Sequence, residues 1–374
     1  MNQPLRPLAG IRVLDFTAVP PGGACTTLLA DLGAEVIRIE APALKGKPST
    51  IFGQVAISRG KRSITLDQRN PKAPEILSRL AATADVVVEN ARPGVMEQRG
   101  FGYSHARGVN PRIVWCAMTG FGQDGPNASH GGHDLNYIAH SGLLGALASD
   151  RNWHPGISMA LQAGALSAVI AIQGALLERA RTGEGAFIDL SFSEAATWML
   201  GCGMNPLSEA PFAIPVTPDR RLYACADGRH LAVACSEPRN WKILCDELGV
   251  PEFTEQLHKW SDADPVMQRL ADIFATRAAQ DWVDLLAPLG AAVTVLNHGA
   301  QVCADPHVIA RRSVVEVAGV SVPASPIRIT AADGSQSETS TIAPPNVGDD
   351  TEDILRDAGF LPEEIDGLVQ DGIV

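Results

Sequence analysis

One segment of the sequence, Gly131–Tyr137 (GGHDLNY), combines residue types that could move a proton. Near pH 7 a neutral histidine can remove a proton from a carbon atom next to a carbonyl group. The carboxylate of the next residue could fix the tautomer and the orientation of the imidazole ring. We therefore interpret His133 as a candidate base and Asp134 as its candidate partner, although a His-Asp pair in a loop can also be structural.

Basic residues beside predicted strands could bind an anionic ligand. Arg38 lies in the strand-like segment 35–40, the pair Lys61 and Arg62 precedes another such segment, and Arg92 follows a third. Fixed cations near strand ends suit phosphate groups, because ligands of a parallel sheet bind in the loops beyond the strands. Surface salt bridges are the alternative interpretation for each of them.

Strand-like and helix-like segments alternate in the first half of the chain. Segments rich in Val and Ile alternate with helical patterns, and glycine ends the first helix at Gly33. This order predicts a parallel, doubly wound α/β sheet. The predicted strands are residues 11–16, 35–40, 63–66, 86–89 and 113–117. The turn after the first strand, Pro20-Pro21-Gly22-Gly23, lacks the G-x-G-x-x-G pattern, which argues against a nicotinamide cofactor.

A second, smaller domain is expected after about residue 195. A Pro-rich connection, 206–218, leads to two strand-like runs around Asp227-Gly228, which is a strong hairpin signal. Predicted helices follow at about 238–248, 264–276 and 279–287, and the C-terminal segment 349–374 is helical and acidic.

The composition excludes some classes of protein. The net charge of −12 and the scattered basic residues argue against nucleic-acid binding. The seven cysteines form no C-x-x-C pair, so we expect reduced thiols in a cytoplasmic protein and no metal site. We expect no secretory signal and no membrane span, since the apolar stretch 163–177 is short and contains Gln173.

Several motifs, in this order and spacing, resemble the family of class III CoA-transferases and α-methylacyl-CoA racemases. They lie at residues 8–15, 30–40, 60–64, 90–94 and 120–126. The resemblance implies the class III CoA-transferase fold, with a large Rossmann-like domain from both chain ends and a smaller α+β domain. We place the large domain at 1–195 and 325–374, and the small domain at 196–324. The resemblance also implies an interlocked homodimer.

The same resemblance implies an acyl-CoA thioester as substrate, with no cofactor beyond that coenzyme A. Arg38 and Arg92 match positions where the relatives contact CoA. Lys61 and Arg62 lie in the motif 60–64, Asn90 lies in the motif 90–94 with Arg92, and these three residues complete the predicted CoA-binding set.

Two matches favour a racemase over a transferase. Racemases of this family carry Gly-His-Asp at the position of His133, with the histidine as catalytic base, whereas many transferases have an aromatic residue there. They also carry a Glu-Pro pair whose carboxylate pairs with that histidine in the dimer, and Glu237 before Pro238 matches it. A glutamate just before a helix is also favourable on structural grounds alone.

The sequence departs from the family at residue 160. Relatives have an aspartate there, which serves racemases as the second acid/base and transferases as the acyl acceptor. Counting back from the Thr182-Gly183 turn places Ala160 at this position, and residues 159–162 contain no carboxylate. An engineered substitution, a natural change of chemistry, and an error in this register are three explanations.

If the register is in error, another group must serve, and we considered Asp150, His154 and Gln162. The main hypothesis is a 2-methylacyl-CoA racemase, or epimerase, that acts through an enolate and is impaired or altered by Ala160. The alternative is a class III CoA-transferase that moves CoA between an acyl-CoA and a free carboxylic acid. A third hypothesis is a catalytically silent CoA-thioester binding protein.

Overall fold

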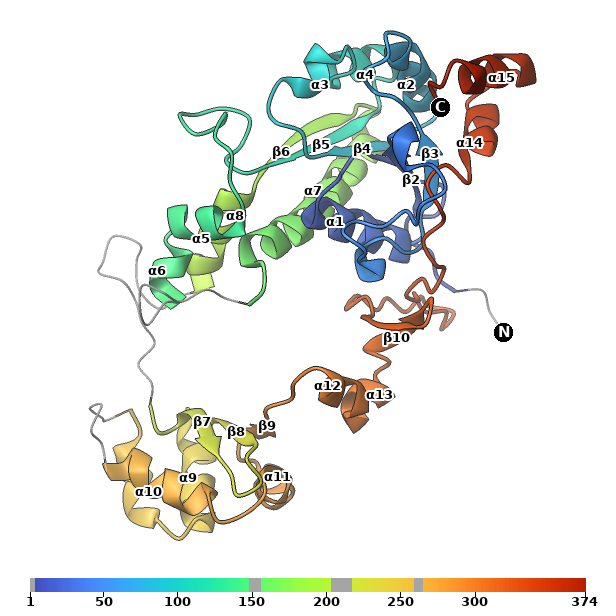
Figure 1. The fold of residues 1–374 in the computed structure, drawn as a ribbon. Coiled ribbons are helices and arrows are strands. Elements are labelled where there is room, and N and C mark those ends of the chain that lie inside the picture. The colour runs from blue at the N-terminus through green and yellow to red at the C-terminus, as the bar shows by residue number, and fades with distance from the viewer. Residues whose placement is uncertain (1–3, 148–155, 203–216, 259–264) are drawn as a thin grey trace. The chain divides into compact units, whose positions relative to one another are not determined.

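The computed structural model describes residues 4–147, 156–202, 217–258 and 265–374 (Figure 1). The chain folds into two compact units, which are residues 1–212 with 309–374, and residues 213–308. The large unit therefore contains both chain ends, and the small unit has narrower limits than the predicted 196–324.

The large unit is built on a six-stranded parallel sheet with the order β3-β2-β1-β4-β5-β6. The strands are β1 (Arg12–Asp15), β2 (Glu35–Glu40), β3 (Arg62–Thr65), β4 (Val86–Glu89), β5 (Val114–Thr119) and β6 (Ala186–Ser191). The chain reverses its winding direction between β1 and β4, so the crevice beyond these two strands is the expected ligand site of such a sheet. The predicted doubly wound α/β class is confirmed.

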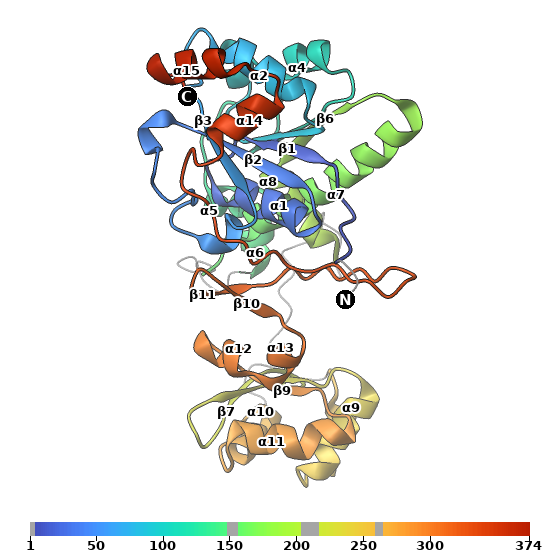
Figure 2. The same cartoon turned by 90° about the vertical axis from the view of Figure 1, so that its right-hand side faces the viewer.

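Helices cover both faces of this sheet (Figures 1 and 2). One face packs against α1 (Pro20–Asp31) and α7 (Met159–Thr182). The other face packs against α2 (Ala73–Ala82), α4 (Tyr103–Val109), α14 (Thr351–Asp357) and α15 (Pro362–Gln370). Residues 86–88 are apolar and fully buried, as expected for a strand covered on both faces.

The longest helix, α7, has one buried side and one exposed side. Its buried side packs against α1, α8 (Phe192–Met199) and the sheet, whereas Ile170 and Leu177 on its other side are 71% and 75% exposed. By length and composition alone this helix is apolar enough to cross a membrane. A buried core helix passes the same test, so the prediction of no membrane span stays a prediction.

Shorter elements complete the large unit. They are α3 (Val95–Gln98), α5 (Asp134–His140), α6 (Leu143–Leu147), and a hairpin of β10 (Val314–Val317) and β11 (Val320–Pro323). Helix α13 (Pro306–Ala310) spans the boundary between the two units.

The small unit has an antiparallel sheet of β7 (Arg220–Ala224), β8 (His230–Ala234) and β9 (Val293–Val295). Gly228 has a φ of 76° in the turn between β7 and β8, which confirms the predicted Asp-Gly hairpin. The helices of this unit are α9 (Pro238–Glu247), α10 (Pro265–Phe274), α11 (Ala279–Leu286) and α12 (Ala300–Ala304). The small unit has its own hydrophobic core, in which Trp241 and Phe274 are fully buried.

Candidate active site

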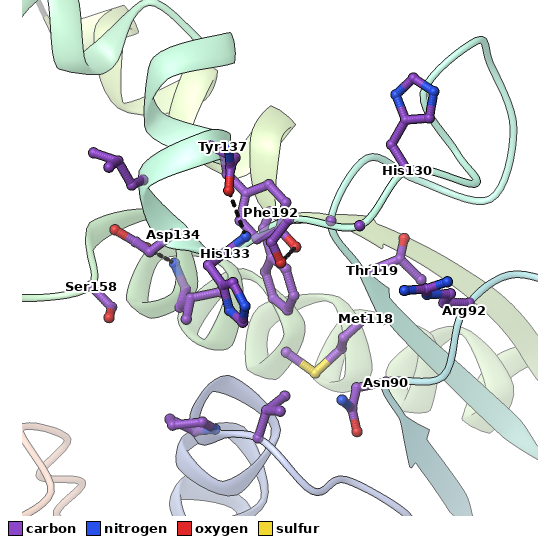
Figure 3. Close-up of a pocket in the computed structure, with 18 of the residues that line it drawn as sticks. Asn90, Arg92, Met118, Thr119, His130, His133, Asp134, Tyr137, Ser158 and Phe192 are labelled. Atoms are coloured by element: carbon purple, nitrogen blue, oxygen red, sulfur yellow. Dashed lines mark hydrogen bonds between the residues drawn. The ribbon is translucent and has the colours of Figure 1, made fainter.

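An open cleft of about 820 Å³ lies in the large unit, beyond the carboxyl ends of β1, β4 and β5. Its lining comes from residues 19–20 after β1, 90–93 after β4, 118–120 at the end of β5, and 130–137. The cleft is therefore at the point where the sheet reverses its winding, and Figure 3 shows the side chains around it.

His133 is the residue just before helix α5, and its ring projects into the cleft (Figure 3). The peptide group that joins Gly132 to His133 is held on both sides. Its carbonyl accepts a hydrogen bond from the Tyr137 hydroxyl at 2.5 Å, and its N–H donates to Asn136 Oδ1 at 3.0 Å. Both partners come from α5, so the helix fixes the backbone that carries the candidate base.

The Tyr137 ring is close enough to make this bond because two glycines leave room for it. A Cβ atom at Gly120 or Gly132 would lie 2.5 or 2.8 Å from the ring, which is too close for any real side chain. The rings of Phe121 and Phe192 pack around Tyr137 with centroid distances of 5.2 and 5.8 Å. Gly120 and Gly132 thus allow the Tyr137 ring to pack close to the backbone.

Asp134 is buried, and both of its carboxylate oxygens accept backbone hydrogen bonds from the first turn of α7. Met159 N–H and Leu161 N–H each donate to it at 3.0 Å. In the described part of the chain no hydrogen bond joins Asp134 to the His133 ring. Our interpretation of Asp134 as the orienting partner of the imidazole therefore needs correction, because Asp134 joins the start of α5 to the start of α7.

Ala160 lies between the two N–H groups that Asp134 binds, and it is fully buried. Its neighbours Ser158 and Leu161 line the cleft. Among the described lining residues, the only carboxylate is that of Asp134. The expected second acid/base is therefore missing from this wall of the cleft.

The other groups considered for that role do not fill the position. Gln162 is exposed and lies outside the cleft lining, whereas Asp150 and His154 lie outside the described residues. His130, which no sequence motif indicated, also lines the cleft, but its ring points away from His133 (Figure 3). The described residues contain no group of three or more side chains that could hold a metal ion.

Of the predicted CoA-binding residues, Asn90 and Arg92 line the cleft. Asn90 Oδ1 accepts the Ala18 N–H at 3.0 Å, which ties the loop after β4 to the loop after β1. Arg92 is exposed, and no described residue forms a salt bridge or hydrogen bond with its guanidinium. It is therefore available to an anionic group of a ligand.

Arg38 and Arg62 lie outside the cleft lining and are paired with carboxylates. Arg38 is buried and lies 3.3 Å from Glu40. The guanidinium of Arg62 donates to Glu35 at 2.5 Å and to Asp350 at 3.4 Å. Their role in phosphate binding stays a prediction that this geometry does not support.

Lys61 is still more enclosed. Its ammonium group is fully buried, 3.2 Å from Asp15 and 2.7 Å from Thr26 Oγ1, and it also donates to two backbone carbonyls. Burial lowers the pKa of Lys61, and the adjacent Asp15 opposes this shift. Because none of its N–H groups is left for a ligand, the structure gives Lys61 a structural role in place of the predicted contact with CoA.

The turn that carries Asn90 and Arg92 rests on a buried acid that the sequence analysis did not identify. Glu89 is 5% exposed, and its carboxylate accepts the Ala91 N–H at 2.6 Å. Burial raises the pKa of Glu89 to about 7. The loop at the cleft therefore depends on a group that can change its charge near neutral pH.

Glu237 lies in the small unit, at the residue before helix α9, where its carbonyl accepts the Trp241 N–H. Its side chain is exposed and caps no backbone N–H of the helix. The predicted pairing of Glu237 with His133 of a second chain stays a prediction.

The chain resembles known proteins in both sequence and fold. A sequence model of CoA-transferase family III matches residues 8–351. The chain is 31% identical to the α-methylacyl-CoA racemase of Homo sapiens in an alignment of 389 positions, which covers 98% of this chain and 97% of that protein. It is 30% identical to an acetyl-CoA:oxalate CoA-transferase of Acetobacter aceti in an alignment of 355 positions. That alignment covers 88% of this chain and 91% of the Acetobacter protein. A solved structure of a CAIB/BAIF family protein from Brucella suis matches with a TM-score of 0.79 at 28% identity, over 95% of this chain and all of that one. The chain therefore belongs to CoA-transferase family III.

Proposed function

We propose that this enzyme of the CoA-transferase and racemase group removes and returns the α-proton of an acyl-CoA thioester, with His133 as the base and an enolate as the intermediate. The observation that carries the proposal is the position of His133, whose ring enters the cleft from a peptide that is clamped on both sides. A neutral imidazole that enters the cleft from a fixed backbone suits proton abstraction near neutral pH. The similarity to α-methylacyl-CoA racemase supports the same reading.

The cleft offers complementary groups for both parts of such a substrate. Arg92 has no partner among the described residues and would bind a phosphate of CoA. The Asn90 amide NH2 group, whose oxygen is bound to Ala18 N–H, would donate a further hydrogen bond. Met118, Leu161 and Phe192 supply apolar surface for an acyl group. We therefore favour an uncharged acyl chain over a dicarboxylate.

Ala160 limits what this site can do. Racemisation through a planar enolate needs one group on each face of the α-carbon, and His133 serves only one face. We infer that the chain exchanges the α-hydrogen with solvent while inversion is slow. Loss of one positioned acid/base group typically slows a reaction about 10²–10⁴-fold.

CoA transfer is the second candidate, because relatives such as the Acetobacter aceti enzyme are named as transferases. A covalent route needs a free carboxylate to accept the acyl group. Residue 160 is alanine, and both oxygens of Asp134 are engaged by backbone N–H groups. These contacts favour proton exchange over transfer for the chain as it stands.

We also propose a homodimer in the cytoplasm. The exposed side of α7, with Leu166, Ile170 and Leu177, is a large apolar surface on a helix that packs elsewhere against the sheet. A second chain would cover it, and a dimer would also allow Glu237 to reach the partner's cleft. Sedimentation velocity should find a dimer at micromolar concentration, and a fully active monomer would refute this part.

Proton NMR in deuterium oxide tests the reaction. With (2R)- and (2S)-2-methylacyl-CoA we expect α-deuterium exchange in at most one epimer and epimerisation near background. Ala160→Asp should restore inversion, and His133→Ala in that variant should abolish it. If the unmodified chain interconverts the epimers rapidly, Ala160 is not at the second-base position. If no exchange occurs in any variant, the binding-protein hypothesis replaces this one, and CoA transfer by Ala160→Asp would favour the transferase.

A further inference from the structure

Among the described residues that line the cleft, Phe52 has the most exposed large aromatic side chain. It is 73% exposed, and it lies in the lining with Val19 and Pro20 at the start of α1. None of these three side chains has a charged or hydrogen-bonding group. An aromatic ring in such a position leaves apolar area in contact with water, which a ligand could remove.

The backbone at Phe52 adopts a conformation that a bulky residue rarely takes. Phe52 has a φ of 50° and Gly53 a φ of 73°, and Gln54 N–H donates to the Ile51 carbonyl at 2.9 Å. Positive φ at both central residues is the pattern of a type I′ turn, which favours Asn, Asp or Gly. For a phenylalanine this is a genuine outlier, and such outliers concentrate at ligand-binding sites.

The base of the turn is fixed, so the tip is held in place. Ile51 is 2% exposed, its N–H donates to the buried Ser58 hydroxyl at 3.1 Å, and its side chain packs onto Gly23 of α1. A Cβ atom at Gly23 would lie 2.6 Å from Ile51 Cδ1, so the glycine permits this contact. The turn thus presents Phe52 from a rigid support at the edge of the cleft.

From these observations we propose that Phe52 is a specificity-determining residue that packs on the hydrocarbon part of the acyl group. The inference rests on the proposed function, because it assumes that an acyl-CoA occupies the cleft. Its apolar neighbours suit a hydrocarbon chain better than adenine or phosphate, which need hydrogen-bonding partners. On this proposal, the contact of the Phe52 ring with the acyl group explains why a phenylalanine is kept at a strained position of the turn.

Calorimetric titration of octanoyl-CoA and of free CoA tests this inference. Phe52→Asn removes the ring and suits the turn, so it should weaken octanoyl-CoA binding about tenfold. Binding of free CoA should be unchanged and the thermal midpoint should not fall. Phe52→Leu is the matched control, since it keeps both an apolar side chain and the unfavourable φ, and it should retain most of the affinity for octanoyl-CoA.

Three results would overturn the inference. Equal losses for CoA and octanoyl-CoA would place the ring against the nucleotide. If Phe52→Asn binds both ligands with unchanged affinity, whether or not a dimer is lost, Phe52 does not contact the ligand and serves another contact. If the unmodified protein binds neither ligand, the proposed function fails as well, whereas a normal unmodified protein with a silent Phe52→Asn variant refutes only the role of Phe52.

Discussion

Glu89→Gln should make the protein more stable at high pH and leave it unchanged at low pH. Glu89 is 5% exposed at the end of β4, and burial raises its pKa from 4.5 to about 7. The folded state therefore holds this proton more tightly than the unfolded chain does. Stability from Glu89 is complete below about pH 4.5 and is lost as the pH rises through about 7.

The size of the effect follows from the two pKa values. At about 1.36 kcal/mol per pKa unit, the loss between pH 4.5 and pH 7 is about 3 kcal/mol. A glutamine is neutral at both pH values, and its carbonyl can still accept the Ala91 N–H. The variant should therefore gain up to about 3 kcal/mol over the unmodified protein at pH 8, and almost nothing at pH 4.5.

Urea unfolding followed by circular dichroism at both pH values measures this difference. Groups other than Glu89 titrate in both proteins, so their contributions cancel in the comparison. Glu338→Gln, an exposed acid of the same unit, is the matched control and should give no pH-dependent gain. If Glu89→Gln changes stability equally at both pH values, Glu89 does not titrate in the folded protein as we argue.

Three further predictions concern the cleft. Tyr137→Phe should slow α-proton exchange about fivefold, because the lost hydrogen bond from the Tyr137 hydroxyl to the Gly132 carbonyl is worth about 1 kcal/mol. NMR exchange rates measure this effect, and an unchanged rate would show that the hydrogen bond does not position His133. Asp134→Ala should lower the free energy of unfolding by about 2–4 kcal/mol, since two N–H donors lose their acceptor, and Asp134→Asn should cost less in the same urea titration. Arg92→Ala should weaken CoA binding about tenfold and reduce its salt dependence, whereas the paired Arg62→Ala should change it little; calorimetry at two salt concentrations separates them.

The fold was largely predictable because its signals are local. The run Val86–Val88 indicates a strand buried on both faces, Gly33 ends a helix, and Asp227-Gly228 indicates a hairpin. The limits of the two units were harder to predict, because the composition of the sequence does not change sharply near residue 309, where the chain returns to the large unit. Helix α7 also begins and ends several residues outside the predicted apolar stretch 163–177.

The site was predictable in its residue types and less so in its contacts. The sequence around Lys61 is typical of a phosphate ligand, but its partner Asp15 is distant in the chain. The two residues come together because β1 and β3 both pair with β2 in the parallel sheet. Phe52 gave no signal, because phenylalanine is disfavoured at the positive φ that it adopts. Such contacts depend on tertiary packing, which a local pattern does not encode.

Asp134 shows why neighbours in sequence need not be partners in chemistry. His133 precedes α5 and has an extended backbone (φ −126°, ψ 178°), so its side chain and that of Asp134, the first residue of the helix, point in different directions. Asp134 uses that direction to bind the start of α7. Within the segment Gly131–Tyr137, the side chains of Asp134, Asn136 and Tyr137 bind backbone groups, whereas no hydrogen bond in the described part of the chain engages the His133 imidazole.

The same contacts make residue 160 a clean position at which to test the chemistry. Asp134 binds the N–H groups of Met159 and Leu161 on either side of it, and these two hydrogen bonds hold the backbone at residue 160. Ala160 is fully buried, and a carboxylate introduced there would be desolvated, which raises its pKa toward neutrality. The nearby Asp134 charge acts in the same direction, whereas the start of α7 opposes it. A carboxyl group with such a pKa can both take and return a proton near pH 7, which is what inversion at the α-carbon requires of a partner for His133.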